Sequence, residues 1–174
     1  HADFDVPRLV AAKGATTVSV CLPARDEAAT VGTIVTTLRD DLLRTGVIDE
    51  VVVIDDHSTD GTAAVAAAAG AVVVDSASVL PEYGGGHGKG EVLWKSLHVT
   101  EGDIVIWCDA DISPFGSRFV SGLLGPLLCE PGVDVAKGYY HRPEFEREGG
   151  GRVTELVAHG TAPRTAVLLC NLGT

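Results

Sequence analysis

The chain has 174 residues, 45% of them hydrophobic, and a formal net charge of −11 at pH 7. This length favours a single domain with a sizeable core, and the acidic balance argues against non-specific binding to nucleic acid or anionic membranes. The sequence has no run of 18 apolar residues that would predict a membrane span, and its first twenty residues lack a signal-peptide pattern.

The four cysteines indicate a reducing compartment. Cys21, Cys108, Cys129 and Cys170 are too far apart in sequence for a paired zinc motif. We therefore expect reduced thiols that act as small hydrophobic residues in a cytoplasmic protein. The chain begins at His1 and contains no Met, so we expect a truncated product.

Strands and helices are predicted to alternate along the chain. Residues 1–15 are expected to be a loose lead-in, and residues 17–22, rich in β-branched side chains, predict a first strand stopped by Pro23. The later elements, in chain order, are a helix over 28–44, a strand over 51–54, an alanine-rich helix ending at Gly70, a strand over 71–75, a glycine-rich loop over 83–90, a helix over 91–99, a strand over 103–109, a helix over 115–128, a strand over 133–140 and a helix beginning within 152–158.

This alternation predicts an α/β fold with a mostly parallel sheet flanked by helices. The apolar run 104–108 would be a buried central strand, and it ends in Asp109-Ala110-Asp111. Alternate residues of an extended segment point the same way, so both carboxylates can face one site. Such oxygen ligands suit Mg²⁺ or Mn²⁺. The alternative is a strand end whose acids only meet solvent.

Three strand ends carry polar groups, at residues 24–27, 55–58 and 109–111. Parallel strands place these ends on one edge of the sheet, where they can build one crevice. Lys89, between Gly88 and Gly90, could meet a phosphate at a helix start. The sequence lacks the glycine and Ser/Thr positions of a P-loop and the glycine triplet of a dinucleotide fingerprint. The alternative for 84–90 is a flexible connector.

The motifs at 23–27 (PARDE), 53–62 (VIDDHSTDGT) and 109–111 (DAD) resemble those of nucleotide-sugar glycosyltransferases with the GT-A fold, which is Rossmann-like. Residues 88–97 (GKGEVLWKSL) and 149–157 (GGGRVTELV) resemble more narrowly the glucosyl-3-phosphoglycerate synthases, which are retaining enzymes. The resemblance covers about residues 17–158 and implies a nucleotide-sugar-binding domain over 1–158, followed by a non-matching tail over 159–174.

The resemblance also implies roles for individual residues. Asp111, with Asp109, would hold Mg²⁺ or Mn²⁺, and Asp111 and Lys89 would act catalytically by stabilising the charge on departing UDP. The residues implied to bind the nucleotide sugar are Pro23, Ala24, Arg25, Glu27, Asp55, Ser58, Lys89, Asp109 and Ala110. Those implied to bind the acceptor, 3-phosphoglycerate, are Gly151, Arg152, Val153 and Thr154.

The acceptor assignment also makes physical sense, because glycines at a helix start expose N–H groups and Arg152 offers a planar fork to an anion. The alternative is a plain loop-to-helix junction. The implied reaction moves glucose from UDP-glucose to the 2-hydroxyl of 3-phosphoglycerate with retention and without a protein nucleophile. His57 and Arg25 depart from the family pattern and leave the base preference open. An inactive nucleotide-binding fragment, a glycosyltransferase with another acceptor, and a homodimer also stay open.

Overall fold

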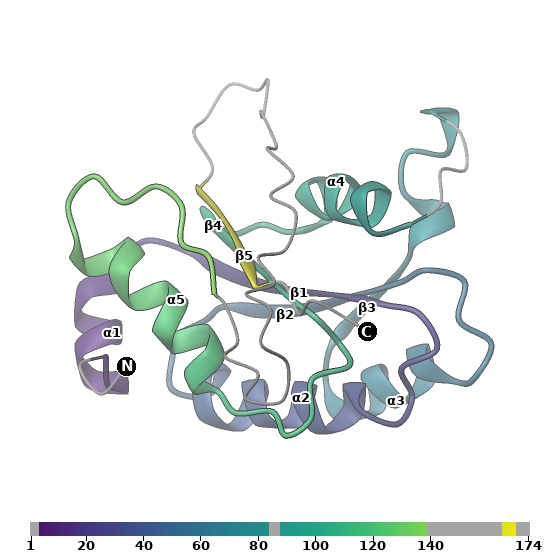
Figure 1. Ribbon diagram of the computed structural model, residues 1–174, viewed down its shortest axis with the longest axis horizontal. Coiled ribbons are helices and arrows are strands. Elements are labelled where there is room, and N and C mark those ends of the chain that lie inside the picture. The colour runs from purple at the N-terminus through teal and green to yellow at the C-terminus, as the bar shows by residue number, and fades with distance from the viewer. Residues whose placement is uncertain (1–3, 84–87, 139–164, 170–174) are drawn as a thin grey trace, which may run out of the picture.

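The computed structural model describes residues 4–83, 88–138 and 165–169, and this part of the chain folds around one parallel sheet (Figure 1). Its five strands lie in the order β3-β2-β1-β4-β5, and every pair is parallel. The α/β prediction with a mostly parallel sheet is therefore confirmed. The elements are α1 (Val6–Lys13), β1 (Val18–Ala24), α2 (Val31–Leu38), the π-helical turn η1 (Arg39–Leu43), β2 (Glu50–Asp55), α3 (Thr62–Ala69), β3 (Val72–Asp75), the short 3₁₀ turns η2 (Ser76–Ser78) and η3 (Pro81–Tyr83), α4 (Lys89–Val99), β4 (Ile104–Cys108), α5 (Arg118–Cys129) and β5 (Thr165–Leu169).

Alternate residues of the central strands pack on opposite faces of the sheet. Leu22, Val53 and Ile106 belong to a core shared with α2 and α5, whereas Ile54 and Trp107 pack with the buried residues of α4. Figure 1 shows α4 above the sheet and α2, α3 and α5 below it. The two-sided burial explains why these strands read as continuous apolar runs.

The thiols follow the same pattern. Cys21 and Cys108 are buried in neighbouring strands on opposite faces, and they and Cys129 are free. Burial is the main cause that raises the pKa of the Cys21 thiol to about 12. Cys21 and Cys108 therefore behave as small hydrophobic residues, as expected, whereas Cys129 is only partly buried and Cys170 lies outside the described residues. None of the described helices has the length and apolar character needed to cross a membrane.

Two elements differ from the sequence expectation. The lead-in contains α1, which Asp5 caps by accepting a hydrogen bond from the Arg8 backbone N–H at 3.0 Å, and Leu9 of this helix is fully buried. The strand expected over 133–140 is wrong where the structure describes it, because 133–138 has only an isolated bridge at Lys137. Val135 is 69% exposed there, whereas Ala136 packs against the core, so the apolar side chains do not alternate between a buried and an exposed face as a strand would place them.

Smaller differences concern where elements begin and end. Pro23 lies inside β1 and does not stop it. Proline has no backbone N–H to donate to a neighbouring strand. This is tolerated at Pro23 because β4 pairs with β1 only as far as Cys21, so one side of β1 is already unpaired there. The 28–44 helix begins at Val31 and finishes as a π-helical turn, and β5 adds a parallel strand within the expected tail. The helix expected within 152–158 lies outside the described residues.

Gly102 provides a test of the close contact between the starts of β1 and β4. A Cβ at this position would lie 2.6 Å from the backbone nitrogen of Ser19 and 2.8 Å from the carbonyl oxygen of Ile104. We expect Gly102→Ala to lower the free energy of unfolding in urea by about 1–3 kcal/mol, as overpacking does. Gly90→Ala in α4 is the control, since its Cβ would meet nothing within 4 Å. Equal stability of the two variants would contradict this packing.

Candidate active site

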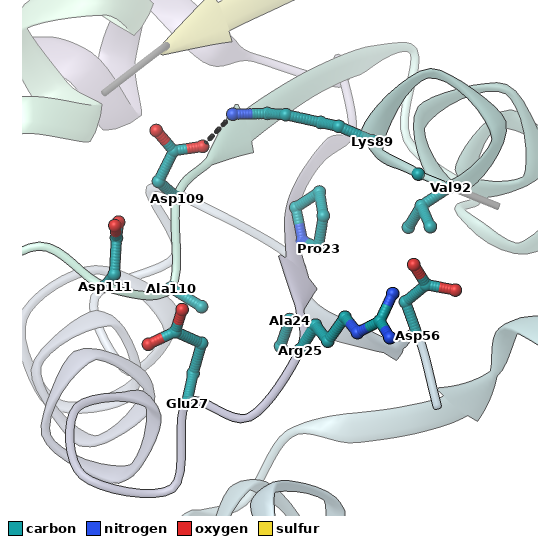
Figure 2. Close-up of a pocket in the computed structure, with 11 residues that line it drawn as sticks. Pro23, Ala24, Arg25, Glu27, Asp56, Lys89, Val92, Asp109, Ala110 and Asp111 are labelled. Carbon is teal, nitrogen blue, oxygen red and sulfur yellow. Dashed lines mark hydrogen bonds and ion pairs between the residues drawn. The ribbon is translucent and has the colours of Figure 1, made fainter. Parts of the chain in front are cut away.

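A pocket of about 410 Å³ lies beyond the carboxyl ends of β1, β2 and β4, with the start of α4 on one side (Figure 2). The crevice predicted from three strand ends is therefore present, and the acidic turn after β4 shares it with the loop after β1. Its lining residues are Pro23, Ala24, Arg25, Glu27, Asp56, Gly88, Lys89, Val92, Asp109, Ala110 and Asp111.

Strand alternation decides which carboxylates enter this pocket. Asp109 is in step with Trp107, and Asp56 is in step with Ile54, so both continue the face of the sheet that α4 covers. Asp55 is out of step, pairs with Ala24 in the sheet and does not line the pocket. Its Oδ1 atom is buried and has no hydrogen-bond partner among the described residues. The nucleotide-binding role expected for Asp55 therefore has no support from its position.

The Asp109-Ala110-Asp111 turn is fixed from two sides. The Thr30 hydroxyl, at the start of α2, donates a hydrogen bond to the Ala110 carbonyl at 2.6 Å. On the other side the Lys89 ammonium forms an ion pair with Asp109, drawn as the dashed line in Figure 2. Asp109 is only 8% exposed, whereas Asp111 is exposed. The turn thus joins α2 to α4 and leaves the Asp111 side chain accessible.

Glu27 adds a third carboxylate to this side of the pocket. Burial raises the pKa of the Glu27 carboxyl first, and the negative charges of Asp111, Asp60 and Asp109 raise it further against a lowering hydrogen bond from Thr30. The part of the shift that these charges cause comes from carboxylates lying close together, and a cation would relieve it.

The donor set fits Mg²⁺ or Mn²⁺ in part. Both ions accept one or two carboxylates and complete their shell with water and phosphate oxygens. Asp109 and Asp111 can supply such carboxylates. No group of three acidic, His or Cys side chains forms a complete metal site within the described ranges. An ion bound here therefore needs ligands from outside this set.

The loop after β1 is held by the motif that follows β2. The Asp26 backbone N–H donates to the Ser58 hydroxyl at 2.9 Å, and the Thr59 N–H donates back to the Asp26 carboxylate at 2.7 Å. The Glu27 N–H donates to the Thr62 hydroxyl at 2.8 Å. Ser58, for which the resemblance implies a nucleotide contact, therefore lies outside the pocket lining and holds the loop that carries Glu27.

Asp56 lines the pocket and was absent from the set expected from sequence. Its Oδ1 accepts a hydrogen bond from the Ser76 hydroxyl at 3.2 Å and lies 3.0 Å from Nδ1 of His57. Burial works to raise the pKa of Asp56, but the hydrogen bonds of His57 and Ser76 and the charges of His57 and Arg25 hold it below its usual range. Asp56 is thus a charged hydrogen-bond acceptor in the pocket wall.

The structure gathers most of the expected nucleotide-sugar residues but does not reach the acceptor residues. Asp55 and Ser58 lie elsewhere, and Gly88, Val92 and Asp56 join the lining unexpectedly. The expected residues that line the pocket are Pro23, Ala24, Arg25, Glu27, Lys89, Asp109, Ala110 and Asp111. The residues expected to bind the acceptor, Gly151, Arg152, Val153 and Thr154, lie outside the described residues. All binding roles stay predictions.

The sequence matches the family model of "Glycosyl transferase family 2" over residues 19–159. Among curated proteins it is 49% identical over 160 residues to a glucosyl-3-phosphoglycerate synthase from Mycolicibacterium smegmatis, covering 89% of this chain and 52% of that protein. The chain spans about half the length of the curated relatives it matches.

Solved structures show the same likeness. The chain superposes on a mannosyl-3-phosphoglycerate synthase from Rubrobacter xylanophilus with a TM-score of 0.79 and 43% identity, covering 89% of this chain and 50% of that one. Against glucosyl-3-phosphoglycerate synthase from Mycobacterium tuberculosis, in complex with Mn²⁺, UDP-glucose and phosphoglyceric acid, the TM-score is 0.73 at 44% identity, with coverages of 88% and 52%. These likenesses confirm the expected GT-A fold.

The crowding of carboxylates can be tested by titration. Asp111→Asn removes the negative charge that, after burial, does most to raise the pKa of Glu27. We expect that pKa, followed by NMR, to fall toward its usual value without reaching it. A raised carboxyl pKa makes the folded state less stable as pH rises from the ordinary value to the raised one, so the substitution also reduces this loss.

Asp103→Asn, at the opposite end of β4, is the matched control and should leave the titration of Glu27 unchanged. An unchanged Glu27 pKa in Asp111→Asn would show that the two carboxylates do not interact.

Proposed function

The chain belongs to glycosyl transferase family 2, and from this premise we propose that it carries the donor site of a cytoplasmic, metal-dependent enzyme that moves glucose from UDP-glucose to the 2-hydroxyl of 3-phosphoglycerate with retention. The observation that carries the proposal is the single pocket in which the Asp109-Ala110-Asp111 turn, Lys89 and the loop after β1 meet. The similar synthases, and the Mn²⁺, UDP-glucose and phosphoglyceric acid bound by one of them, support it.

Charge in the pocket explains why the donor needs a cation. Four carboxylates line the pocket, at Glu27, Asp56, Asp109 and Asp111, against Arg25 and Lys89 as the opposing cations. A diphosphate would be repelled by this surface unless a divalent ion lay between them. Asp111 and Asp109 would hold Mg²⁺ or Mn²⁺, which supplies charge stabilisation to the departing diphosphate.

Lys89 stands where it can assist the leaving group. It is the first residue of α4, its side chain is 45% exposed, and its ammonium reaches across to Asp109. The helix start adds the partial positive charge of its free N–H groups. Lys89 can therefore turn from Asp109 toward the diphosphate and hold it as a point charge.

The other end of the pocket suits a nucleobase. Pro23 and Ala24 give it an apolar wall, and the guanidinium of Arg25 extends toward Asp56 in Figure 2. Asp56 is charged and can only accept hydrogen bonds, so it suits an N–H of the base. Uracil offers one such imide N–H. The pocket thus has an apolar and acceptor end for the base and an acidic, metal-binding end for the diphosphate.

A second candidate is a nucleotide-binding unit that does not complete the transfer alone. The pocket contains residues expected for the nucleotide sugar, whereas those expected for the acceptor lie outside the described residues, so the geometry by itself supports nucleotide binding. A mannosyl-3-phosphoglycerate synthase is among the structural relatives, so mannose is the second donor sugar to test. A radiolabel transfer assay to 3-phosphoglycerate, from UDP-glucose or GDP-mannose and with or without Mn²⁺, separates these cases. Metal-dependent transfer from UDP-glucose supports the proposal, and UDP binding without transfer supports the binding unit.

Asp111 provides the most specific test of the metal site. We expect Asp111→Ala to weaken UDP binding in the presence of Mn²⁺ by on the order of 100-fold, or about 2.8 kcal/mol, because the cation that would join the carboxylates to the diphosphate loses a protein ligand. Titration calorimetry with UDP, with and without Mn²⁺, measures this. Asp134→Ala, an exposed acid outside the pocket lining, is the control and should bind as the unchanged protein does. Unchanged binding by Asp111→Ala would refute the metal role.

A further inference from the structure

Lys95 is a buried charge that the proposed reaction does not use. It lies in α4 and is only 2% exposed. Its ammonium donates a hydrogen bond to the Ser76 carbonyl at 2.9 Å and lies 3.3 Å from Oε1 of Glu91, one turn earlier in the same helix. Taking an ammonium out of water costs several kcal/mol before its partners compensate. The burial of this charge therefore needs an explanation in its contacts.

The contacts of Lys95 lead to the pocket along two routes. Ser76 is itself 2% exposed, and its hydroxyl donates to Oδ1 of Asp56, which lines the pocket. Lys89 and Val92, which belong to α4 as Lys95 does, also line this pocket. The Lys95–Ser76 bond therefore joins the helix that makes one wall to the segment that holds the other wall.

Stability alone does not account for this charge. The Ser76 carbonyl also accepts from the Val79 backbone N–H at 3.3 Å, so it keeps a partner without Lys95. The Glu91 side chain is 24% exposed, so water can reach it. Removing one partner of a buried ion pair is most costly where the remaining charge stays buried, and the partly exposed Glu91 carboxylate is not in that position. A methionine at position 95 would retain most of the buried packing.

We propose that Lys95 and Ser76 are positioning residues of the nucleotide pocket. Lys95 fixes α4 to the turn η2 through the Ser76 carbonyl, and the Ser76 hydroxyl fixes Asp56. The two links act in series, so together they set the distance between the α4 wall and the Asp56 wall. The inference rests on the proposed function in taking a nucleoside diphosphate as the pocket's ligand. Neither residue touches the pocket itself.

The test is UDP binding in the presence of Mn²⁺, measured by calorimetry well below the melting temperature. We expect Lys95→Met and Ser76→Ala each to weaken binding by about tenfold, in the range that members of one hydrogen-bond network show. The double variant should bind about as weakly as either single variant, because breaking one of two links in series already releases the walls. Ser76→Ala keeps the test valid if Lys95→Met does not fold.

Val120→Ala, which removes buried volume from α5 on the other face of the sheet, is the control for lost stability and should keep the unchanged affinity. Full affinity in Lys95→Met and Ser76→Ala, while the unchanged protein binds UDP, would overturn this inference alone. Independent losses that multiply in the double variant would also overturn it. An unchanged protein that does not bind UDP overturns the proposed function and this inference with it.

Discussion

The alternation of side chains along three parallel strands is the constraint on which the rest of this structure depends. β1, β2 and β4 lie side by side, and one set of alternate residues packs against the core shared with α2 and α5, while the other packs against α4. Beyond the carboxyl ends of the strands, the residues that continue the face toward α4 line the pocket instead of the core. Asp109 and Asp56 enter it for this reason, whereas Asp55 is held on the opposite face. The site is therefore a continuation of the packing pattern of the sheet.

Once these carboxylates share one pocket, their mutual repulsion organises the local chemistry. Burial and then the negative charge of Asp111 raise the pKa of Glu27, and Lys89 pairs with Asp109. The crowded acids favour a divalent cation and, through it, a diphosphate. The loop that carries Glu27 is held in place by Thr62 and by the contacts of Asp26 with Ser58. Rigid support of this kind lets like charges stay close together before any ligand arrives.

Sequence patterns were sufficient for the strands and helices from β1 to α5 and for the crevice, because apolar runs and the polar residues that end them are local features. They did not distinguish Asp55 from Asp56, since that choice depends on which face each residue takes, and the alternation with Val52 and Ile54 was the available signal. The Ser58 hydroxyl accepts a hydrogen bond from the Asp26 N–H, a long-range contact that no local pattern encodes, while the nucleotide contact expected for Ser58 stays a prediction. The α1 helix was missed although Asp5 and Pro7 are ordinary start signals.

The central claim is that the acidic turn after β4 holds a metal-bound nucleoside diphosphate while the base lies between the β1 loop and Asp56. A crystal structure of the chain grown with Mn²⁺ and UDP tests it most directly, because manganese can be located by its anomalous scattering. The account predicts an anomalous peak bound to Asp111 and to the diphosphate, with uracil against Pro23 and Ala24. A peak at other residues, or UDP bound outside this pocket, would contradict it.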